Sequence, residues 1–268
     1  MVLELLQYDF MQKALLAGVF ITLICGILGV FLVLKRLSLI GDGISHIAFG
    51  GIAAGIFFNL NPFFSAIAAS IASAFAIEKL REKTRVYSDA SIGIVFSTVL
   101  SIGVVLISLA NGFNSDLHSF LFGNIISVTD LDLVMAASLG IIVLAVLLFY
   151  RRQLMYACFD EKSAQSAGIN VSRLNLLLIL LTAIAVSISI RIVGVLLVSS
   201  FLIIPPASAL QIAKSFNKAL IYSVLFGLIS LITGLIASFY FDIASGGAII
   251  LSSAILFFAA ATGKKLIK

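Results

Sequence analysis

The chain is a succession of apolar stretches, each close to the length that crosses a lipid bilayer. A helical span needs about 20 mostly apolar residues. Nine candidate spans can be delimited, at 14–34, 38–58, 62–78, 89–110, 131–150, 174–190, 193–212, 219–240 and 246–263. Hydrophobic residues make up 62% of the chain and charged residues 11%, whereas soluble domains average about 45–50% and about 25%. The sequence therefore predicts an all-α integral membrane protein, a polytopic helix bundle that forms one transmembrane domain over residues 1–268.

The boundary between the sixth and seventh spans is marked only by Arg191, in the stretch SISIRIVGVLLV. Eight spans, with one long or re-entrant segment, are therefore an alternative to nine. Nine spans place 15 of the 17 Lys and Arg residues in loops on one side, with Lys13 and Arg191 as the exceptions. Because basic loops stay in the cytoplasm, the nine-span count predicts an N-terminus outside and a cytoplasmic C-terminus. An even count would break this alternation.

Two ionisable residues interrupt the second span, in the stretch GDGISHIAFGG at 41–51. Arg36 marks the basic surface and His46 follows ten residues later. That separation is about 15 Å along a helix, which is close to the middle of a hydrocarbon core about 30 Å thick. Asp42 and His46 share a helix face because they are four residues apart.

A carboxylate beside a neutral imidazole forms half of a site for zinc, manganese or ferrous iron. Charged groups inside a membrane are costly and usually mark a pathway or a binding site. The sequence therefore predicts a partial metal site at Asp42 and His46. The alternative is structural: the two side chains hydrogen-bond to each other, or they cap and hold neighbouring helices.

The longest polar interruption on the predicted cytoplasmic side is residues 151–175. Its pattern predicts a short helix from Asp160 to Ala167, followed by Gly168 as a C-terminal cap. Asp160 and Glu161 suit the positive end of the helix dipole. A compact helix displayed between spans can dock a soluble partner, and a plain connecting loop is the alternative.

Three further positions carry two interpretations each. Asp89 begins the fourth span, where a carboxylate is either an N-terminal cap or part of a pathway or gate. Pro205 and Pro206 interrupt the seventh span, either as a broken helix that lines a transport cavity or as a kink whose freed backbone groups bond to neighbours. His118 lies in an outer loop, and we interpret it as a surface residue rather than an entry ligand.

Several stretches resemble, in order, the membrane subunits of zinc- and manganese-type ATP-binding cassette (ABC) importers. The signature of that family resembles RLSLIGDGISHIAFGGIAAG at 36–55. Further matches are SDASIGIVFS at 88–97, HSFLFGNIISVT at 118–129, FDEKSAQSAGI at 159–169, IVGVLLVSSFLIIPPASA at 192–209 and DIASGGAIIL at 242–251. The chain departs from the family at Phe49 and Gly50, where many members carry a Leu-Pro or similar pair, and in the extra proline at 205–206.

The resemblance implies the permease subunit of an importer for a divalent transition metal ion: zinc, manganese or ferrous iron. It assigns Asp42 and His46 to the transport pathway, and Asn124 and Asp242 to an outer gate. It also implies a cytoplasmic coupling segment that contacts the ATPase, with Phe159, Asp160, Glu161, Ala164 and Gly168 as the matching residues. The implied partners are a second permease copy in a homodimer, two cytoplasmic ATPase subunits and an extracytoplasmic metal-binding protein, at a prokaryotic cell membrane.

The chain has no Gly-rich phosphate loop that ends in Lys-Ser/Thr, so ATP hydrolysis is predicted on a partner and the chain alone is not an enzyme. The metal ion is then the transported substrate, and no permanently bound cofactor or nucleic acid is expected. Two alternatives are a permease of the cobalamin and iron-siderophore type and a proton-coupled secondary metal transporter that works through His46. An intramembrane metalloprotease is disfavoured because a His-Glu-x-x-His helix is missing.

Overall fold

The computed structural model is a helix bundle, and it describes residues 9–83, 88–110, 120–121, 123 and 129–266. Within these residues there are ten helices and no strands. The helices are α2 (Asp9–Leu34), α3 (Leu39–Phe57), α4 (Pro62–Lys83), α5 (Ser88–Leu109), α7 (Asp130–Phe159), α8 (Glu161–Ser166), α9 (Val171–Val193), α10 (Val195–Ile212), α11 (Phe216–Phe241) and α12 (Ser245–Leu266). The predicted all-α fold is confirmed.

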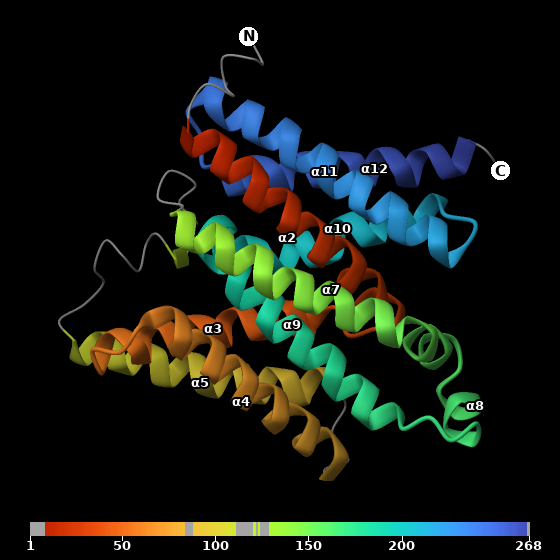
Figure 1. The fold of residues 1–268 in the computed structure, drawn as a ribbon, viewed down its shortest axis with the longest axis horizontal. Helices are drawn as coiled ribbons and strands as arrows, with labels where there is room; N and C mark the ends of the chain where they lie inside the picture. Colours follow the sequence, from red (N-terminus) through yellow and green to blue (C-terminus); the bar gives the residue numbers. More distant parts are fainter. Residues whose placement is uncertain (1–8, 84–87, 111–119, 122, 124–128, 267–268) are drawn as a thin grey trace.

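The long helices run back and forth along the bundle, so that α2 begins at one end and α12 finishes at the other (Figure 1). The turn from α2 to α3, the short helix α8 and the turn from α10 to α11 lie at the same end of the bundle as the end of α12. We call this the basic end, because it carries Lys35, Arg36, Lys162, Lys214 and Lys218. The side of the membrane that the basic end faces stays a prediction.

Eight helices in the described part of the chain are long and apolar enough to cross a bilayer, and α10 contributes a shorter apolar stretch, Val198–Ile212. The sixth and seventh predicted spans are separate helices, α9 and α10. They part at Gly194, whose φ of 88° and ψ of 157° are accessible almost only to glycine. Arg191, which marked this boundary in the sequence, lies inside α9.

Helix α7 extends beyond the predicted fifth span, 131–150, and continues into the polar segment 151–175 as far as Phe159. The reason is its packing: Leu154 and Ala157 lie on one helix face and are completely buried. The connection that remains between α7 and α9 is therefore short, and α8 occupies most of it.

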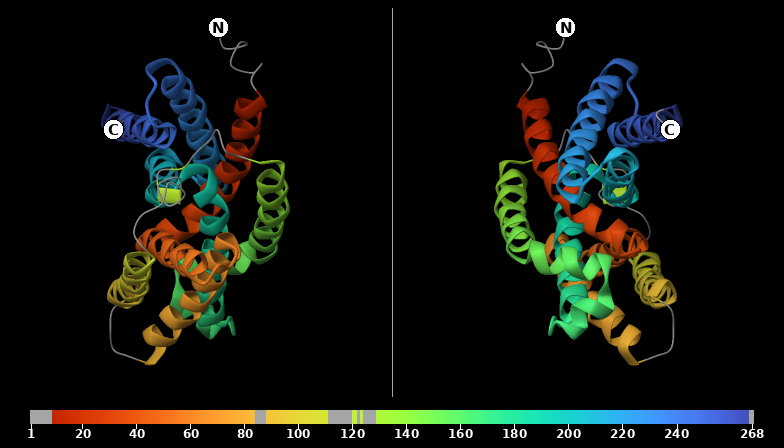
Figure 2. Two further views of the ribbon diagram at one scale, coloured as in Figure 1. Left: turned by 90° about the vertical axis from the view of Figure 1, so that its left-hand side faces the viewer. Right: turned by 90° about the vertical axis from the view of Figure 1, so that its right-hand side faces the viewer.

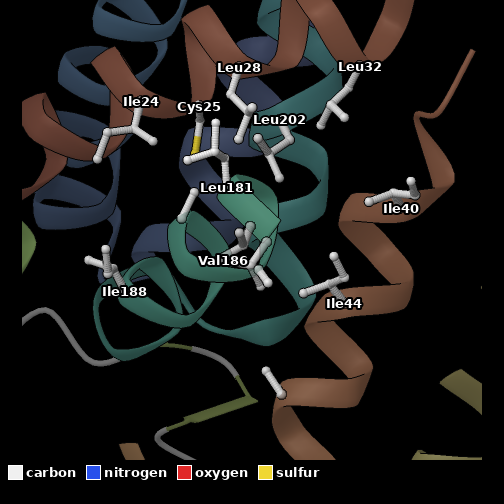
Figure 3. Close-up of a cluster of buried hydrophobic side chains, with 14 of the residues drawn as sticks. Ile24, Cys25, Leu28, Leu32, Ile40, Ile44, Leu181, Val186, Ile188 and Leu202 are labelled. Atoms are coloured by element: carbon white, nitrogen blue, oxygen red, sulfur yellow. The ribbon is translucent and has the colours of Figure 1, made fainter. Parts of the chain in front are cut away.

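The core is built around α2, α3, α9 and α10. Figure 3 shows side chains from these helices meeting, including Leu28 of α2, Ile44 of α3, Val186 of α9 and Leu202 of α10. Helices α5, α7 and α12 are far less buried and lie at the periphery (Figure 2). Among the described residues they carry half of the large exposed apolar side chains, as expected of helices that face lipid.

Glycine brings α3 and α5 into close contact. A Cβ atom on Gly50 would lie 2.7 Å from the carbonyl oxygen of Val99, and one on Gly103 would lie 2.8 Å from the Cα of Gly50. Small residues allow helix backbones to approach in this way in membrane proteins. Gly50, a departure from the family signature, thus has a packing reason in this chain.

Candidate metal site on helix α3

Helix α3 is one of the most buried helices of the bundle. Asp42 and His46 form the part of its surface that the other helices leave open, which we call the uncovered strip. From Ile40 to Ala53, every residue of α3 is buried except Asp42 and His46. Their side chains are 47% and 28% exposed. The rest of this stretch is covered by α4, α5, α9 and α10. An apolar helix in the middle of the bundle therefore presents one carboxylate and one imidazole, and nothing else, on its open side.

The two side chains approach each other without hydrogen-bonding. His46 Nε2 lies 3.8 Å from Asp42 Oδ1, beyond the reach of a hydrogen bond. The interpretation in which the pair is satisfied by its own hydrogen bond is thus not realised. Two atoms that each bind a zinc ion at about 2.1 Å lie at most about 4.2 Å apart, so the pair is spaced to share one ion.

Neighbouring helices fix the direction of the pair. The ring of His46 stacks on that of Phe96 from α5, with centroids 5.7 Å apart and planes inclined by 28°. On the other side, a Cβ atom at Gly41 would lie 3.0 Å from the Leu202 side chain of α10. Ser45, between the two ionisable residues, turns away and donates to the carbonyl oxygen of Gly41 at 2.8 Å. The pair thus lies on a surface bordered by α5 and α10.

Phe96 was not singled out from the sequence. It lies in the SDASIGIVFS stretch, where an aromatic residue four positions after Ile92 was the only available signal. Its partner on another helix cannot be inferred from spacing.

The described residues of one copy do not complete a metal site. Among the described residues, no group of three or more His, Cys, Asp or Glu side chains could hold an ion. Two side chains are fewer than the four ligands of a closed zinc site. Beyond these described side chains, water or another molecule can supply further ligands.

Neither Asp89 nor Asp242 joins this pair in a group that could hold an ion. Asp89 is exposed in the first turn of α5. Asp242 is exposed at the end of the bundle opposite the basic end. It is the C-cap of α11 and has a left-handed φ of 51°. Pro205 is buried inside α10, which continues through both prolines. Asn124 lies outside the described residues, as does His118.

The predicted coupling segment contains a well-formed short helix. Asp160 caps α8 by accepting hydrogen bonds from the backbone N–H and the hydroxyl of Ser163. These bonds hold the pKa of Asp160 below its ordinary value. Ala164 is fully buried against the bundle, whereas Phe159 is 67% exposed. The C-cap of α8 is Ala167 rather than the predicted Gly168, and Gly168 follows it at a left-handed φ of 82°.

Comparison with known proteins agrees with this architecture. A sequence model of the ABC 3 transport family matches residues 7–264. The manganese transport system membrane protein MntC of Listeria monocytogenes is 36% identical over 256 residues, which cover 96% of this chain and 91% of MntC. The high-affinity zinc uptake system membrane protein ZnuB of Haemophilus influenzae is 33% identical over 251 residues, which cover 94% of this chain and 96% of ZnuB.

A solved structure of PsaBC from Streptococcus pneumoniae in complex with Fab shares the fold, with a TM-score of 0.86 and 31% sequence identity. The match covers 97% of this chain and 95% of that one. These similarities span nearly the full length of each protein and confirm the resemblance that the motifs indicated. The chain is a multi-pass membrane protein and belongs to the ABC 3 transport family.

Proposed function

We propose that this chain is the permease subunit of an ABC importer that moves a divalent transition metal ion into the cytoplasm. The observation that carries the proposal is the uncovered strip of α3, where Asp42 and His46 are the two partly exposed residues between Ile40 and Ala53. A carboxylate that faces lipid at this depth would be costly. The strip is therefore expected to face a water-filled pathway.

The incomplete ligand set points to a second copy. A homodimer with its two-fold axis along the pathway would bring two Asp42–His46 pairs together and offer four side-chain ligands. That number satisfies a tetrahedral ion. The described residues of a single copy offer two, fewer than the four ligands of a closed zinc site.

The relatives narrow the substrate to a small group. MntC is named for manganese and ZnuB for zinc, and one nitrogen with one carboxylate oxygen per copy suits both ions and ferrous iron. In the proposed cycle an extracytoplasmic protein delivers the ion to an outward-open dimer. The ion is held at Asp42 and His46 until the pathway opens on the cytoplasmic side.

The basic end is the proposed cytoplasmic end, and residues 151–175 form its coupling segment. Within that segment the exposed surface of α8 is available to an ATPase, with Phe159, Asp160 and Glu161 on its rim and Ala164 anchoring it to the bundle. ATP hydrolysis belongs to two such partner subunits. Residues 1–268 then act as one permease domain.

Uptake of manganese, zinc and ferrous iron into proteoliposomes tests the proposal. The vesicles contain this chain with its ATPase, and the binding protein is added outside. We expect ATP-dependent uptake of at least one metal, and its loss in both Asp42→Ala and His46→Ala. Ser45→Ala is the matched control, because its hydroxyl bonds only within its own helix and uptake should be retained.

The possible outcomes separate the alternatives. Uptake that survives in both variants would remove the pair from the pathway while leaving the importer in place. ATP hydrolysis without movement of any free metal would favour the metal-chelate permease. Metal uptake that needs a proton gradient and no ATPase would favour the secondary transporter.

A further inference from the structure

A lysine is buried at the basic end of the bundle. The side chain of Lys35 is only 2% exposed. A buried ammonium group is tolerated when it is paired and hydrogen-bonded. Lys35 Nζ lies 2.7 Å from Glu161 Oε1 of α8 and 2.5 Å from Asn175 Oδ1 of α9. One side chain thus joins the end of α2 to the proposed coupling helix and to the first turns of α9.

Lys35 also leads directly into the helix that carries the metal ligands. Arg36 adopts a left-handed φ of 57°, and the N–H of Leu37 bonds to the carbonyl oxygen of Leu32 at 2.9 Å. This tight closure ends α2, and α3 begins at Leu39. Asp42 follows within the first turn of α3. The Lys35 turn is therefore joined to Asp42 by a short, ordered stretch of backbone.

The start of α9 is also hydrogen-bonded to α4, the helix that follows α3 in the chain. Ser172 donates to Glu78 of α4 at 3.0 Å, and Arg81 donates to the same carboxylate at 3.0 Å. Helix α4 follows α3 in the chain and packs along it. The same region of α9 therefore holds both the element before α3 and the element after it.

An open pocket of about 430 Å³ lies among these elements at the basic end. Its lining residues are Lys35, Leu37, Arg81, Glu161 and Asn175. Interiors are usually close-packed and resist displacement. An open volume beside the Lys35–Glu161 contact leaves room for α8 to move relative to α2 and α4, with the lysine as the connection between them.

We propose that Lys35 is a positioning residue that transmits the movement of α8 to the metal-binding strip of α3. Glu161 receives the displacement of the coupling helix, and Lys35 passes it to the turn that starts α3. Asn175 holds the ammonium group in line between them. The inference rests on the proposed importer function, and it assigns a role to a residue that the sequence marks only as one of several basic loop residues.

The test measures metal uptake and ATP hydrolysis in the same proteoliposomes. Lys35→Met keeps the apolar stem and removes the charge. We expect the ratio of metal taken up to ATP hydrolysed to fall about tenfold, as for the loss of a strongly coupled contact, while basal ATP hydrolysis and the amount of bound ATPase stay near wild type. Lys79→Met, an exposed lysine of α4 outside the coupling segment, is the matched control and should change neither quantity.

Exchanging the two charges of the ion pair distinguishes a role of Lys35 in transmitting movement from a role in stabilising the fold. In the double variant Lys35→Glu with Glu161→Lys the ion pair can re-form, and Asn175 can turn its amide group to donate to the new carboxylate. Recovery of the uptake ratio supports transmission through the pair. A ratio unchanged in Lys35→Met, or uptake and basal hydrolysis that fall together and are not recovered by the reversal, overturns the inference.

Glu161→Gln tests the inference if the Lys35→Met chain does not assemble with its ATPase. Glu161 is 56% exposed, so its replacement should leave the helix bundle intact. It should lower the ratio of metal taken up to ATP hydrolysed, with both quantities expressed per ATPase retained in the vesicles because Glu161 also lies on the rim of the proposed ATPase-facing surface, and an unaltered ratio overturns the inference. Wild-type vesicles without ATP-driven metal uptake would instead refute the proposed function itself.

Discussion

Replacing Gly50 with alanine should force α3 away from α5. The new Cβ atom would lie 2.7 Å from the Val99 carbonyl oxygen, about 0.7 Å inside the 3.4 Å at which ordinary contact begins. The obstacle is a backbone atom in the middle of a helix, so it cannot rotate aside. Such overpacking costs about 1–3 kcal/mol.

A matched substitution isolates this cost. Gly93, on α5, has nothing within 4 Å of its added Cβ atom. Both replacements gain about 1 kcal/mol of helix propensity, so the free energy of unfolding of Gly50→Ala should lie about 1–3 kcal/mol below that of Gly93→Ala. Reversible unfolding by SDS in mixed micelles measures the difference. Gly103→Ala approaches the same contact from α5, 2.8 Å from the Cα of Gly50, and should show a comparable loss.

The same displacement should reach the uncovered strip of α3. His46 lies one helical turn before Gly50, and its ring stacks on Phe96 of α5. Metal uptake by Gly50→Ala should therefore fall in vesicles that contain equal amounts of folded protein. If Gly50→Ala and Gly93→Ala unfold at the same SDS fraction, the close approach of α3 and α5 is wrong, and the argument about the strip loses its support.

Three smaller predictions concern other elements. Gly194→Ala should lower the free energy of unfolding by about 1–3 kcal/mol, measured by the same SDS titration, because its φ of 88° and ψ of 157° exclude a side chain. Ser223→Ala removes a 2.8 Å hydrogen bond to the carbonyl oxygen of Gly26 and should lower the free energy of unfolding by only about 0.6 kcal/mol. A loss several times larger would show that this hydrogen bond alone does not account for the effect of the substitution. Asp160→Ala should increase hydrogen exchange in α8. Because Ser163 lowers the pKa of Asp160, the wild-type cap should be intact above the ordinary aspartate range and weaken only as pH falls through the lowered pKa, which exchange measured from pH 8 to pH 3 would follow.

Helix type and number follow from the apolar pattern, but two boundaries depend on information that the pattern lacks. Arg191 is the only charge near the predicted end of the sixth span, yet α9 continues through it and the chain turns at Gly194 instead. The signal for Gly194 is conformational rather than hydropathic. Helix α7 extends past its basic residues because Leu154 and Ala157 find a covered face, and such a face exists only after the other helices have packed.

The candidate site likewise has one feature that follows from the sequence and one that depends on how the helices pack. Spacing alone places Asp42 and His46 on one face of a helix, and the structure brings them to 3.8 Å. That this face is the uncovered strip of α3 depends on how four other helices pack around it. Lys35 shows the limit of the topological rule: a basic loop residue is expected to be solvated, and this one is almost completely buried.

Tight packing and an incomplete ligand set together constrain how an ion could be released. Small residues such as Gly50 hold α3 closely against its neighbours, so Asp42 and His46 cannot easily separate from each other. In the proposed homodimer the number of ligands around the ion then changes chiefly when the two copies move relative to one another. Bringing the pairs together offers four ligands and parting them leaves two. The affinity for the ion would thus change when the two copies move, not when one copy rearranges internally. Such a mechanism requires a rigid α3 and a movable connection between α3 and α8. Lys35 lies at that connection.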